Sequence, residues 1–522
     1  MKKYRLFLFF STLFLAVIAI LFFVRWKSPY APLKGESFIY FNNSQATGEE
    51  LAKAYCQMCH LYPEPSLLDK KTWNDKVLPD MGKRLGIRPN GIDPYKGLDS
   101  MIAKEAKEFN IYPETPLITE TDWNKIVNFY IENAPKELPP IKKTVESVDS
   151  KFTPSYITIG DKKLPLVTLL KWNENTSELY IGDATDLYVL KNNKTLTARY
   201  KLNSPASHIE FDDELSTLLL TIGLVMPNDR FLGKLNVLDP VKKDHVINLE
   251  KLKRPVHVAV SDLNKDGKKD AVISNFGHRD GSLSWYDGFD NSKEHVLKNL
   301  PGTRKAEIKD MNGDNKPDVI AMMTQAYEQI IIFYNLGDGK FEEKPVLSFN
   351  PAHGLSYFET VDFNNDGHLD LLVSNGDNRD LSVIDKPYHG VRIYLNDGLN
   401  NFEEAYFYPM YDCNKVMARD FDNDGDLDIV ASAFWSQYTE NRNLKESFVY
   451  LNNTGNLNFI PSYLPGVAHG KWLTMDVGDF NNDNLLDVML GAAIFTTNET
   501  IQVLTATGIS DFPQVLILTQ TK

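Results

Sequence analysis

The chain has 522 residues, of which 43% are apolar and 24% are charged, and this is the composition of a folded globular protein. One hydrophobic core is too little for this length, so the sequence predicts roughly two to four domains. The formal net charge of −14 argues against nucleic acid as a partner, because phosphate binding relies on Lys and Arg. With only three cysteines, a disulfide-rich scaffold is excluded.

The N-terminal segment, residues 1–28, is predicted to be a signal-anchor that forms a single transmembrane helix. Lys2, Lys3 and Arg5 precede an uncharged, mainly apolar run at residues 6–24. As a helix this run would extend about 28 Å, enough to cross a hydrocarbon core. Arg25 and Lys27 follow the run where a cleaved signal would have a small-x-small site, so an uncleaved anchor is favoured.

The most specific chemistry lies in the pentapeptide CQMCH at residues 56–60. Two thiols three positions apart, followed at once by an imidazole, match the attachment site of one covalent c-type haem. Cys56 and Cys59 would bond the haem vinyl groups and His60 would ligate the iron. A redox dithiol and a zinc half-site are the alternatives, but structural zinc takes about four ligands. The third cysteine, Cys413, is distant in sequence and is expected to be a free thiol in a core.

Helical patterns surround this pentapeptide. The sequence from Thr47 to Glu50 is a capping box that predicts a helix running into the first cysteine. A second helix is expected to carry Trp73 and Val77, and a third is expected to begin after a cap at Thr119. Since c-type haem is attached on the exported side of the bacterial membrane, these helices and the rest of the body are expected in the periplasm or otherwise outside the cytoplasm.

The sixth ligand of the iron is predicted to be a methionine. Met81 is the first choice, because the neighbouring Pro79 and Gly82 predict an irregular loop, and Met101, in a stretch with a helical pattern, is the alternative. Residues 45–137 resemble a small, all-α, class I-like cytochrome c in the CxxCH site and in the helix layout. This resemblance implies electron transfer and a redox partner protein.

A charged stretch at residues 138–152 is predicted to be a linker, because a long region of short β-rich runs follows it. In that region, residues 153–522, one nine-residue unit recurs five times, 48 to 59 residues apart, beginning at Asp262, Asp310, Asp362, Asp420 and Asp479. A period of about 50 residues with strands between the units is typical of a β-propeller with one blade per repeat. Two earlier segments, residues 166–193 and 208–238, have similar strands with incomplete units, so seven blades are predicted.

The repeated unit is predicted to bind up to five Ca²⁺ ions. Oxygen-bearing side chains at positions 1, 3, 5 and 9 of a tight loop suit a hard cation, and Gly or Asn at position 6 tolerates the positive φ of a sharp turn. No Glu occupies position 12, so the units are not EF-hands. The predicted ligands are Asp262, Asn264, Asp266, Asp270, Asp310, Asn312, Asp314, Asp318, Asp362, Asn364, Asp366, Asp370, Asp420, Asp422, Asp424, Asp428, Asp479, Asn481, Asp483 and Asp487.

These repeats resemble the FG-GAP and VCBS family, the calcium-loop blades known from integrin α-subunits, over roughly residues 255–516. The resemblance implies that the calcium loops follow the innermost strands and are mainly structural, while ligands meet the opposite face. It also implies that the two ends of the propeller region share one blade, to which residues 156–158 would contribute a strand.

A candidate channel mouth follows from the same repeat, because the residue five positions before each unit is expected near the entrance of the innermost strand. Those residues are His208, His257, Lys305, Tyr357, Lys415 and Thr474, and Lys471 lies nearby in sequence. In an acidic protein, His208, His257, Lys305, Lys415 and Lys471 predict a mouth that attracts a carboxylate, a sugar acid or the acidic patch of a partner. Ordinary polar lining of a wet channel is the alternative.

Three functional classes are consistent with this sequence. The first, which we favour, is an exported, membrane-anchored electron carrier whose propeller docks a partner or ligand. The second is a glycan- or protein-binding adhesion module with an accessory haem, and the third is an oxidoreductase with a further cofactor in the propeller. The sequence contains no nucleophile elbow, phosphate loop or HExxH motif, which favours an electron carrier over a catalyst.

Overall fold

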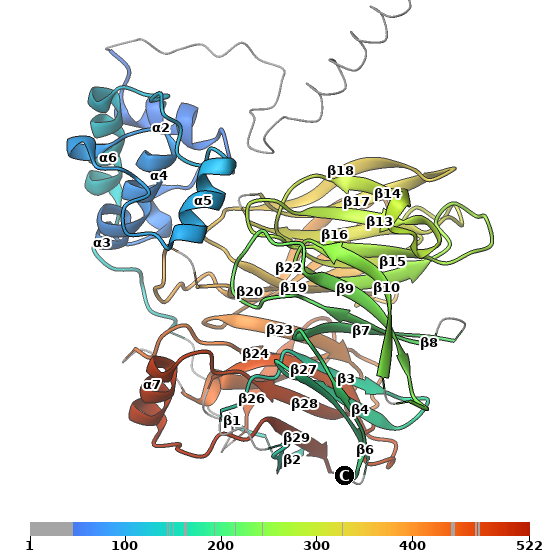
Figure 1. Ribbon diagram of the computed structural model, residues 1–522. Helices are drawn as coiled ribbons and strands as arrows, with labels where there is room; N and C mark the ends of the chain where they lie inside the picture. Colours follow the sequence, from blue (N-terminus) through green and yellow to red (C-terminus); the bar gives the residue numbers. More distant parts are fainter. Residues whose placement is uncertain are drawn as a thin grey trace, which may run out of the picture.

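The computed structural model describes residues 45–521 apart from 143, 144, 146, 150, 161–163, 193, 214, 215, 243, 326, 380, 440–443, 465, 466, 468 and 469. The predicted membrane anchor at residues 6–24 lies outside the described residues. Among those that are described, no helix is both long and apolar enough to cross a membrane. The described chain forms a helical domain followed by seven β-sheets, and Figure 1 shows the helices α2 to α6 grouped apart from the strands.

The helical domain consists of short helices around one apolar core. Its elements are α2 (Gly48–Cys56), the 3-10 turn η1 (Pro65–Leu67), α3 (Lys70–Thr72), the π-turn η2 (Trp73–Val77), α4 (Leu78–Arg84), the 3-10 turn η3 (Pro89–Gly91), α5 (Ser100–Glu108) and α6 (Glu120–Asn133). The predicted capping box at Thr47 is confirmed, since its hydroxyl accepts from the Glu50 amide and the Glu50 carboxylate accepts from the Thr47 amide. The predicted cap at Thr119 is confirmed as well.

The prediction of an irregular loop around Met81 is wrong, because Met81 lies inside α4. Pro79 is the second residue of that helix, where a missing N–H is tolerated. The π-turn η2 leads directly into α4, with the Leu78 N–H bonded to the Trp73 carbonyl. Gly82 is needed for packing rather than for a turn, since a Cβ there would lie 3.0 Å from ring atoms of Trp123.

The first and last helices of this domain cross in close contact. A Cβ at Gly48 of α2 would lie 2.2 Å from the carbonyl oxygen of Lys125 on α6, so only glycine allows this approach. Tyr130 of α6 is fully buried, and its ring centroid lies 4.4 Å from that of Trp73. Trp123, Ile126 and Tyr130 are the buried apolar residues of this helix, so they form its contribution to the core.

The seven sheets form the blades of a β-propeller, and we number them in chain order. Blade 1 is β3 (Leu169–Asn173), β4 (Glu178–Gly182), β5 (Asp186–Lys191) and β6 (Leu196–Lys201); blade 2 is β7 (Ala206–Asp212), β8 (Ser216–Thr221), β9 (Gly233–Asp239) and β10 (Asp244–Leu252). Blade 3 is β11 (Pro255–Ser261), β12 (Asp270–Asn275), β13 (Ser282–Tyr286) and β14 (Glu294–Lys298); blade 4 is β15 (Thr303–Lys309), β16 (Asp318–Thr324), β17 (Glu328–Gly337) and β18 (Lys340–Phe349).

The remaining blades follow the same order of strands. Blade 5 is β19 (Leu355–Val361), β20 (Asp370–Asn375), β21 (Gly390–Asn396) and β22 (Phe402–Pro409). Blade 6 is β23 (Cys413–Arg419), β24 (Asp428–Ala433), β25 (Phe448–Asn453) and β26 (Phe459–Tyr463), and blade 7 contains β27 (Trp472–Gly478), β28 (Asp487–Ala492) and β29 (Val515–Gln520). The first strand of every blade contacts the first strands of both neighbouring blades, so the ring is closed and the seven predicted blades are confirmed.

The last blade is completed by a strand from the start of the propeller region. β2 (Phe152–Ile157) pairs antiparallel with β29, with Tyr156 opposite Leu516, so the predicted closure is confirmed. The predicted linker is partly structured, because β1 (Ser147–Val148) adds to the edge of blade 6 in parallel with β26. Sequence analysis also missed α7 (Thr497–Thr507), which lies between β28 and β29.

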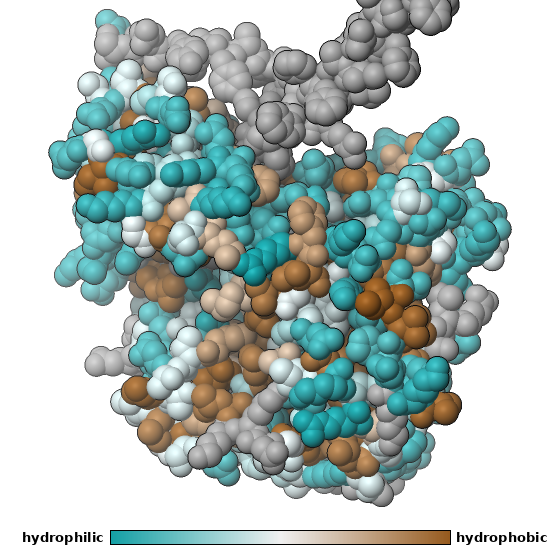
Figure 2. Space-filling view, viewed as in Figure 1, coloured by the Kyte–Doolittle hydropathy of each residue, from teal (hydrophilic) through white to brown (hydrophobic). Residues whose placement is uncertain are grey.

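The helical domain contacts one face of the propeller, opposite the acidic loops. The acidic loops join the first and second strands of blades 3 to 7, whereas the helical domain contacts loops that precede a first strand or join a second strand to a third. Hydrophilic side chains cover most of this domain in Figure 2, and hydrophobic side chains gather toward its boundary with the propeller. The acidic loops are therefore separated from the CxxCH segment by the depth of the propeller.

Candidate functional site

The CxxCH segment begins at the C-terminal end of α2. Cys56 is the last residue of this helix, and Cys59 and His60 follow in the turn after it. Both cysteines are free thiols. Tyr130 of α6 lies beside them, with its hydroxyl 3.9 Å from the Cys56 Sγ and donating to the Pro63 carbonyl at 2.7 Å. The two thiols and the imidazole thus lie on one short segment, in which Cys56 packs against the helical core.

The thiols are not set up for redox exchange as a dithiol. Burial raises the pKa of Cys56 to about 11, and the pKa of Cys59 is also raised, mainly by burial. Redox-active cysteines have lowered pKa values, because the thiolate is the reactive form. This environment therefore disfavours the redox-dithiol alternative and leaves covalent modification of the two sulfurs as the better use of the pair.

The imidazole of His60 has the arrangement of a metal ligand. Its Nδ1 lies 2.8 Å from the Leu61 carbonyl oxygen, and a histidine held in this way presents a neutral Nε2 to a metal. Burial lowers the pKa of His60, which also favours the neutral, ligating form. The donor set of two thiols and one oriented imidazole fits the attachment of a c-type haem.

The two candidate methionines occupy different surroundings. Met81 is partly buried and packs against the apolar core that also contacts Cys56. Met101, on α5 as expected, is 46% exposed and its sulfur contacts the guanidinium of Arg230 in the propeller. The structure thus brings Met81, and not Met101, into the cluster around the CxxCH segment.

The five acidic loops share one backbone geometry. In each loop, one carboxylate oxygen of position 1 accepts a hydrogen bond from the N–H of position 6, at 2.8 to 3.1 Å. The position-6 residues Gly267, Asn315, Gly367, Gly425 and Asn484 all have positive φ, which confirms the predicted sharp turn. Position 4 also has positive φ in every loop, at Lys265, Gly313, Asn365, Asn423 and Asn482, and sequence analysis missed this second turn.

Position 9 of each loop acts as a clamp between strands. These carboxylates are fully buried, and one oxygen of each accepts from the N–H of position 2 of its own loop. The other oxygen accepts from an N–H at the end of the third strand in that blade, except in blade 3, where the donor is Gly288 two residues past the strand. The residues are Asp270, Asp318, Asp370, Asp428 and Asp487. They hold each loop in shape, and lone pairs remain on their oxygens for a cation.

The clamp also recruits a recurrent asparagine that sequence analysis did not use. Asn335, Asn396 and Asn453 end or nearly end the third strands of blades 4 to 6, and their N–H groups donate to position 9. Their side-chain amides donate to backbone carbonyls near the loops. An asparagine that recurs at or near the end of the third strand in three successive blades is the signal that would have revealed this bond.

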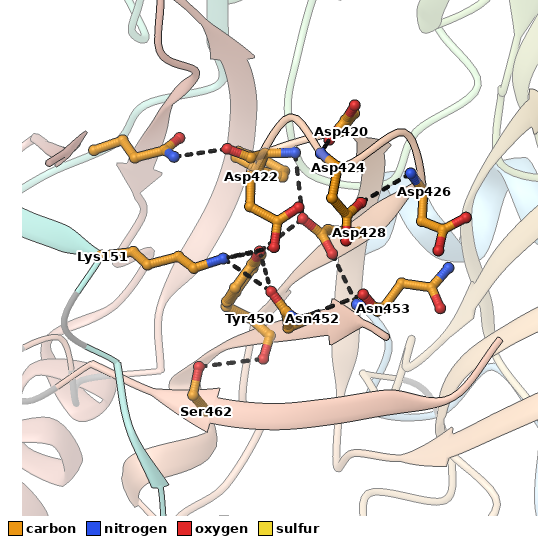
Figure 3. A network of polar contacts seen from close by, with 12 residues as sticks. Lys151, Asp420, Asp422, Asp424, Asp426, Asp428, Tyr450, Asn452, Asn453 and Ser462 are labelled. Atoms are coloured by element: carbon orange, nitrogen blue, oxygen red, sulfur yellow. Dashed lines mark hydrogen bonds and ion pairs between the residues drawn. The ribbon is translucent and has the colours of Figure 1, made fainter. Parts of the chain in front are cut away.

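The acidic loop of blade 6 differs from the others, as Figure 3 shows. Ligand atoms of Asp420, Asp422 and Asp424 all lie within 4.8 Å of one another, the one such carboxylate group found in the described part of the chain. The ammonium of Lys151 lies 3.1 Å from Oδ2 of Asp422 and donates to the Tyr450 hydroxyl and the Asn452 carbonyl oxygen at 3.0 and 2.8 Å. Asp422 replaces the asparagine found at position 3 of the other four loops, so its extra charge is matched by this lysine.

The predicted channel residues converge at one level of the propeller. His208 and His257 have ring centroids 4.0 Å apart, and the Lys305 and Lys415 ammonium groups lie 4.1 and 4.8 Å from the ring centroid of Tyr357. These residues come from the same position of neighbouring first strands, β7 to β23. Lys471 does not join them: it is fully buried and donates to the Trp435 carbonyl.

Acidic side chains two positions further along the same strands offset much of this positive charge. Lys305 donates to Glu307 at 2.7 Å and to the Phe358 carbonyl at 2.6 Å. The Lys415 ammonium donates to the Met475 carbonyl at 2.6 Å. Burial, with the charges of Lys171 and Lys305, lowers the pKa of Lys415 to about 8 against the opposing effect of Asp476. The cationic side chains at this level of the channel therefore belong to a network of polar contacts.

A family model described as an FG-GAP-like repeat matches residues 310–373. The matched segment runs from the acidic loop of blade 4 through the acidic loop of blade 5 into β20. The chain thus contains FG-GAP-like repeat sequence within a seven-bladed β-propeller. No curated protein matches the chain.

Two kinds of solved structure are similar to it at low identity. A structure of BBS1N in complex with ARL6DN is 11% identical, covers 51% of this chain and 74% of its own, and has a TM-score of 0.34. A structure of S. cerevisiae Dbp5 bound to Nup159, Gle1, IP6 and ADP is 11% identical, covers 73% of this chain and 99% of its own, and has a TM-score of 0.40. At these scores the likeness adds nothing to the description of the fold, which rests on the seven sheets.

Proposed function

We propose that this protein is an exported, membrane-anchored c-type haem protein that transfers electrons. The observation that carries the proposal is the CxxCH segment at the end of α2, where two protonated thiols and a neutral imidazole, bonded through its Nδ1, lie on one turn. Cys56 and Cys59 would hold the haem and His60 would ligate its iron, while the bound haem supplies a one-electron redox centre. The helical domain would then be a cytochrome c domain.

An absorption spectrum of the full chain, produced in a host that matures c-type haem, tests this proposal. We expect one covalent haem per chain, and its loss in the Cys56→Ser and Cys59→Ser variants. A chain that carries no covalent haem would contradict the proposal. The oxidised spectrum also tests the sixth ligand, since a sulfur-to-iron band that disappears in Met81→Ala but persists in Met101→Ala would identify Met81.

The same proposal assigns calcium to the acidic loops, as structural ions that stiffen the propeller. The paired turns at positions 4 and 6 and the buried clamp at position 9 hold the side chains of positions 1, 3 and 5 on one short loop. Carboxylate and amide oxygens in such a loop suit Ca²⁺, which takes six to eight oxygen ligands. Up to five ions would be bound, one in each of blades 3 to 7.

An exposed apolar patch supports docking of a redox partner. Met101 and Ile102 of α5 are 46% and 40% exposed, and Met226 and Phe231 of the β8–β9 loop are 68% and 52% exposed. The contact between Met101 and Arg230 joins these two surfaces. Exposed patches of this kind mark interaction sites, and Met101 and Ile102 place part of this patch on the helical domain that would carry the haem.

As a further part of the proposal, we expect an anionic ligand to bind in the channel. The ammonium of Lys415 has three donors, of which the bond to the Met475 carbonyl takes one. Calorimetric titration with acetate should show binding that is lost in Lys415→Met and kept in Lys471→Met, since Lys471 lies elsewhere. Equal binding by the two variants would contradict an anion site at this level.

The two alternative functions have their own signatures. An adhesion module would show glycan binding, and an enzyme with a second cofactor would show a second chromophore.

A further inference from the structure

Two hydrogen bonds join the backbone just after His60 to the propeller. The Asn350 side-chain amide donates to the Tyr62 carbonyl at 2.9 Å, and the Tyr388 hydroxyl donates to the Leu67 carbonyl at 2.7 Å. Asn350 follows β18 of blade 4 and Tyr388 lies in the β20–β21 loop of blade 5. Residues 62–67, which continue the histidine-bearing turn, are therefore held at both ends by the other domain.

Apolar contacts join the two domains at the same place. Ala352 of the propeller is buried in the apolar core of the helical domain, and Ile384 and Tyr388 pack against that core. The core also contacts Cys56 and Met81. The propeller thus contributes side chains to the cluster that surrounds the CxxCH segment, and the small helical core is incomplete without it.

Tyr388 is itself held from several sides within the propeller. Its carbonyl accepts from the Arg392 guanidinium at 2.9 Å, and its ring centroid lies 5.0 Å from that of His353 and 5.8 Å from that of His389. His389 is fully buried, with its Nδ1 3.5 Å from Oδ1 of the fully buried Asp412. A side chain supported in this way can fix the position of the group to which it donates.

Other residues on this side of the propeller also interact with the helical domain. Burial, together with the nearby Cys59, raises the pKa of Tyr327 in the β16–β17 loop of blade 4. A second anchoring point lies at blade 3, where Arg279 pairs with Glu105 of α5 at 3.3 Å and with Asp229 at 3.2 Å. The helical domain is thus fixed on the propeller face at two separate places.

We propose that Tyr388 and Asn350 are positioning residues for the haem-binding segment, so that the loops of blades 4 and 5 form one wall of the haem site and set its reduction potential. This inference rests on the haem attachment proposed above. The wall would limit access of water to the site, and burial and second-shell hydrogen bonds are among the factors by which a protein sets a haem potential. A change in blade 5 would then alter the haem without any contact with the iron.

Redox titration of the haem-loaded full chain tests this proposal with three variants. Tyr388→Phe and Asn350→Ala each remove one bond to the histidine-bearing turn. Tyr406→Phe is the matched control, because the Tyr406 hydroxyl of blade 5 is buried without a hydrogen-bond partner, so its loss breaks no such bond. We expect the equilibrium constant for reduction to fall threefold or more in each of the first two variants and to stay within threefold of the native value in Tyr406→Phe.

Three further readouts separate the outcomes. Amide hydrogen exchange at residues 61–67 should be faster in Tyr388→Phe and Asn350→Ala, while haem content and thermal unfolding of the propeller remain native. Reduction constants within threefold of native in both variants, with normal haem content, would overturn the positioning role. If Tyr388→Phe does not fold, the result for Asn350→Ala decides. Absence of covalent haem from the native chain would instead contradict the proposed function.

Discussion

The clearest case of charge balance at a single residue is Asp186 in blade 1. Its side chain is 1% exposed and pairs with Arg199 at 2.8 Å and Lys201 at 3.3 Å. Burial raises the pKa of Asp186, but the hydrogen bonds from Arg199, Thr185 and Lys201 outweigh it and hold the pKa at about 2. A carboxylate whose folded pKa lies below its unfolded value stabilises the fold at neutral pH.

We therefore expect Asp186→Asn to lower the free energy of unfolding more at pH 7 than at pH 3. The stabilisation is present above the unfolded pKa of 3.8 and is lost as the pH falls toward the folded pKa of about 2. Denaturant unfolding of the native chain and the variant at both pH values measures the difference. Asp244→Asn, at a carboxylate that is 73% exposed, serves as the control, and equal losses at the two pH values would disagree with this account.

At the scale of an element, the acidic loop combines a structural clamp with a candidate metal site. Position 9 is buried and bonded to two backbone N–H groups, whereas position 5 is exposed in blade 5. Sequence analysis treated both positions alike, as ligands. The structure shows that the two positions differ even without a bound ion. Position 9 joins the loop to the third strand of the blade, and position 5 does not.

We expect Asp370→Ala to destabilise the calcium-free protein by about 2–4 kcal/mol, since two buried N–H groups lose their acceptor. Asp366→Ala, in the same loop, is expected to cost less than about 1 kcal/mol, because its carboxylate is exposed. Chemical unfolding in the presence of a chelator measures both values. Similar losses in the two variants would show that position 9 has no separate structural role.

At the scale of the whole molecule, the two candidate sites lie at opposite faces of the propeller. The CxxCH segment lies against the loops of blades 4 and 5, and the acidic loops lie at the opposite ends of the first strands. Bound calcium would therefore stabilise the propeller without contacting the proposed haem site. This separation makes the two proposed cofactors experimentally independent.

Removal of calcium is expected to lower the melting temperature of the propeller by about 10 °C or more. A ligand at 100 times its dissociation constant stabilises a fold by about 2.7 kcal/mol per site, and five predicted sites would add several such contributions. Calorimetry with calcium and with a chelator measures the shift, and the haem absorption spectrum serves as the control. An unchanged melting temperature would contradict structural calcium in these loops.

The sequence by itself determined the local features of this protein. The capping box at Thr47, the turn residues at position 6 and the period of the repeat each depend on a few neighbouring residues, and the structure confirms them. The seven blades were predicted from five complete and two incomplete repeats, and the closing strand was predicted from the resemblance to the FG-GAP and VCBS family. The structure confirms both predictions. The CxxCH motif remains a prediction of haem.

Only the tertiary structure decided which distant residues meet. Met81 lies in a helix into which the π-turn η2 leads directly and in which Trp123 packs close to Gly82, and neither feature can be read from the local pattern. Lys471 leaves the channel because its neighbour in space is Trp435. The bonds from Asn350 and Tyr388 to the turn after His60 join residues almost 300 or more positions apart. Such contacts depend on the packing of one domain on another, for which the sequence of either segment carries no periodic signal.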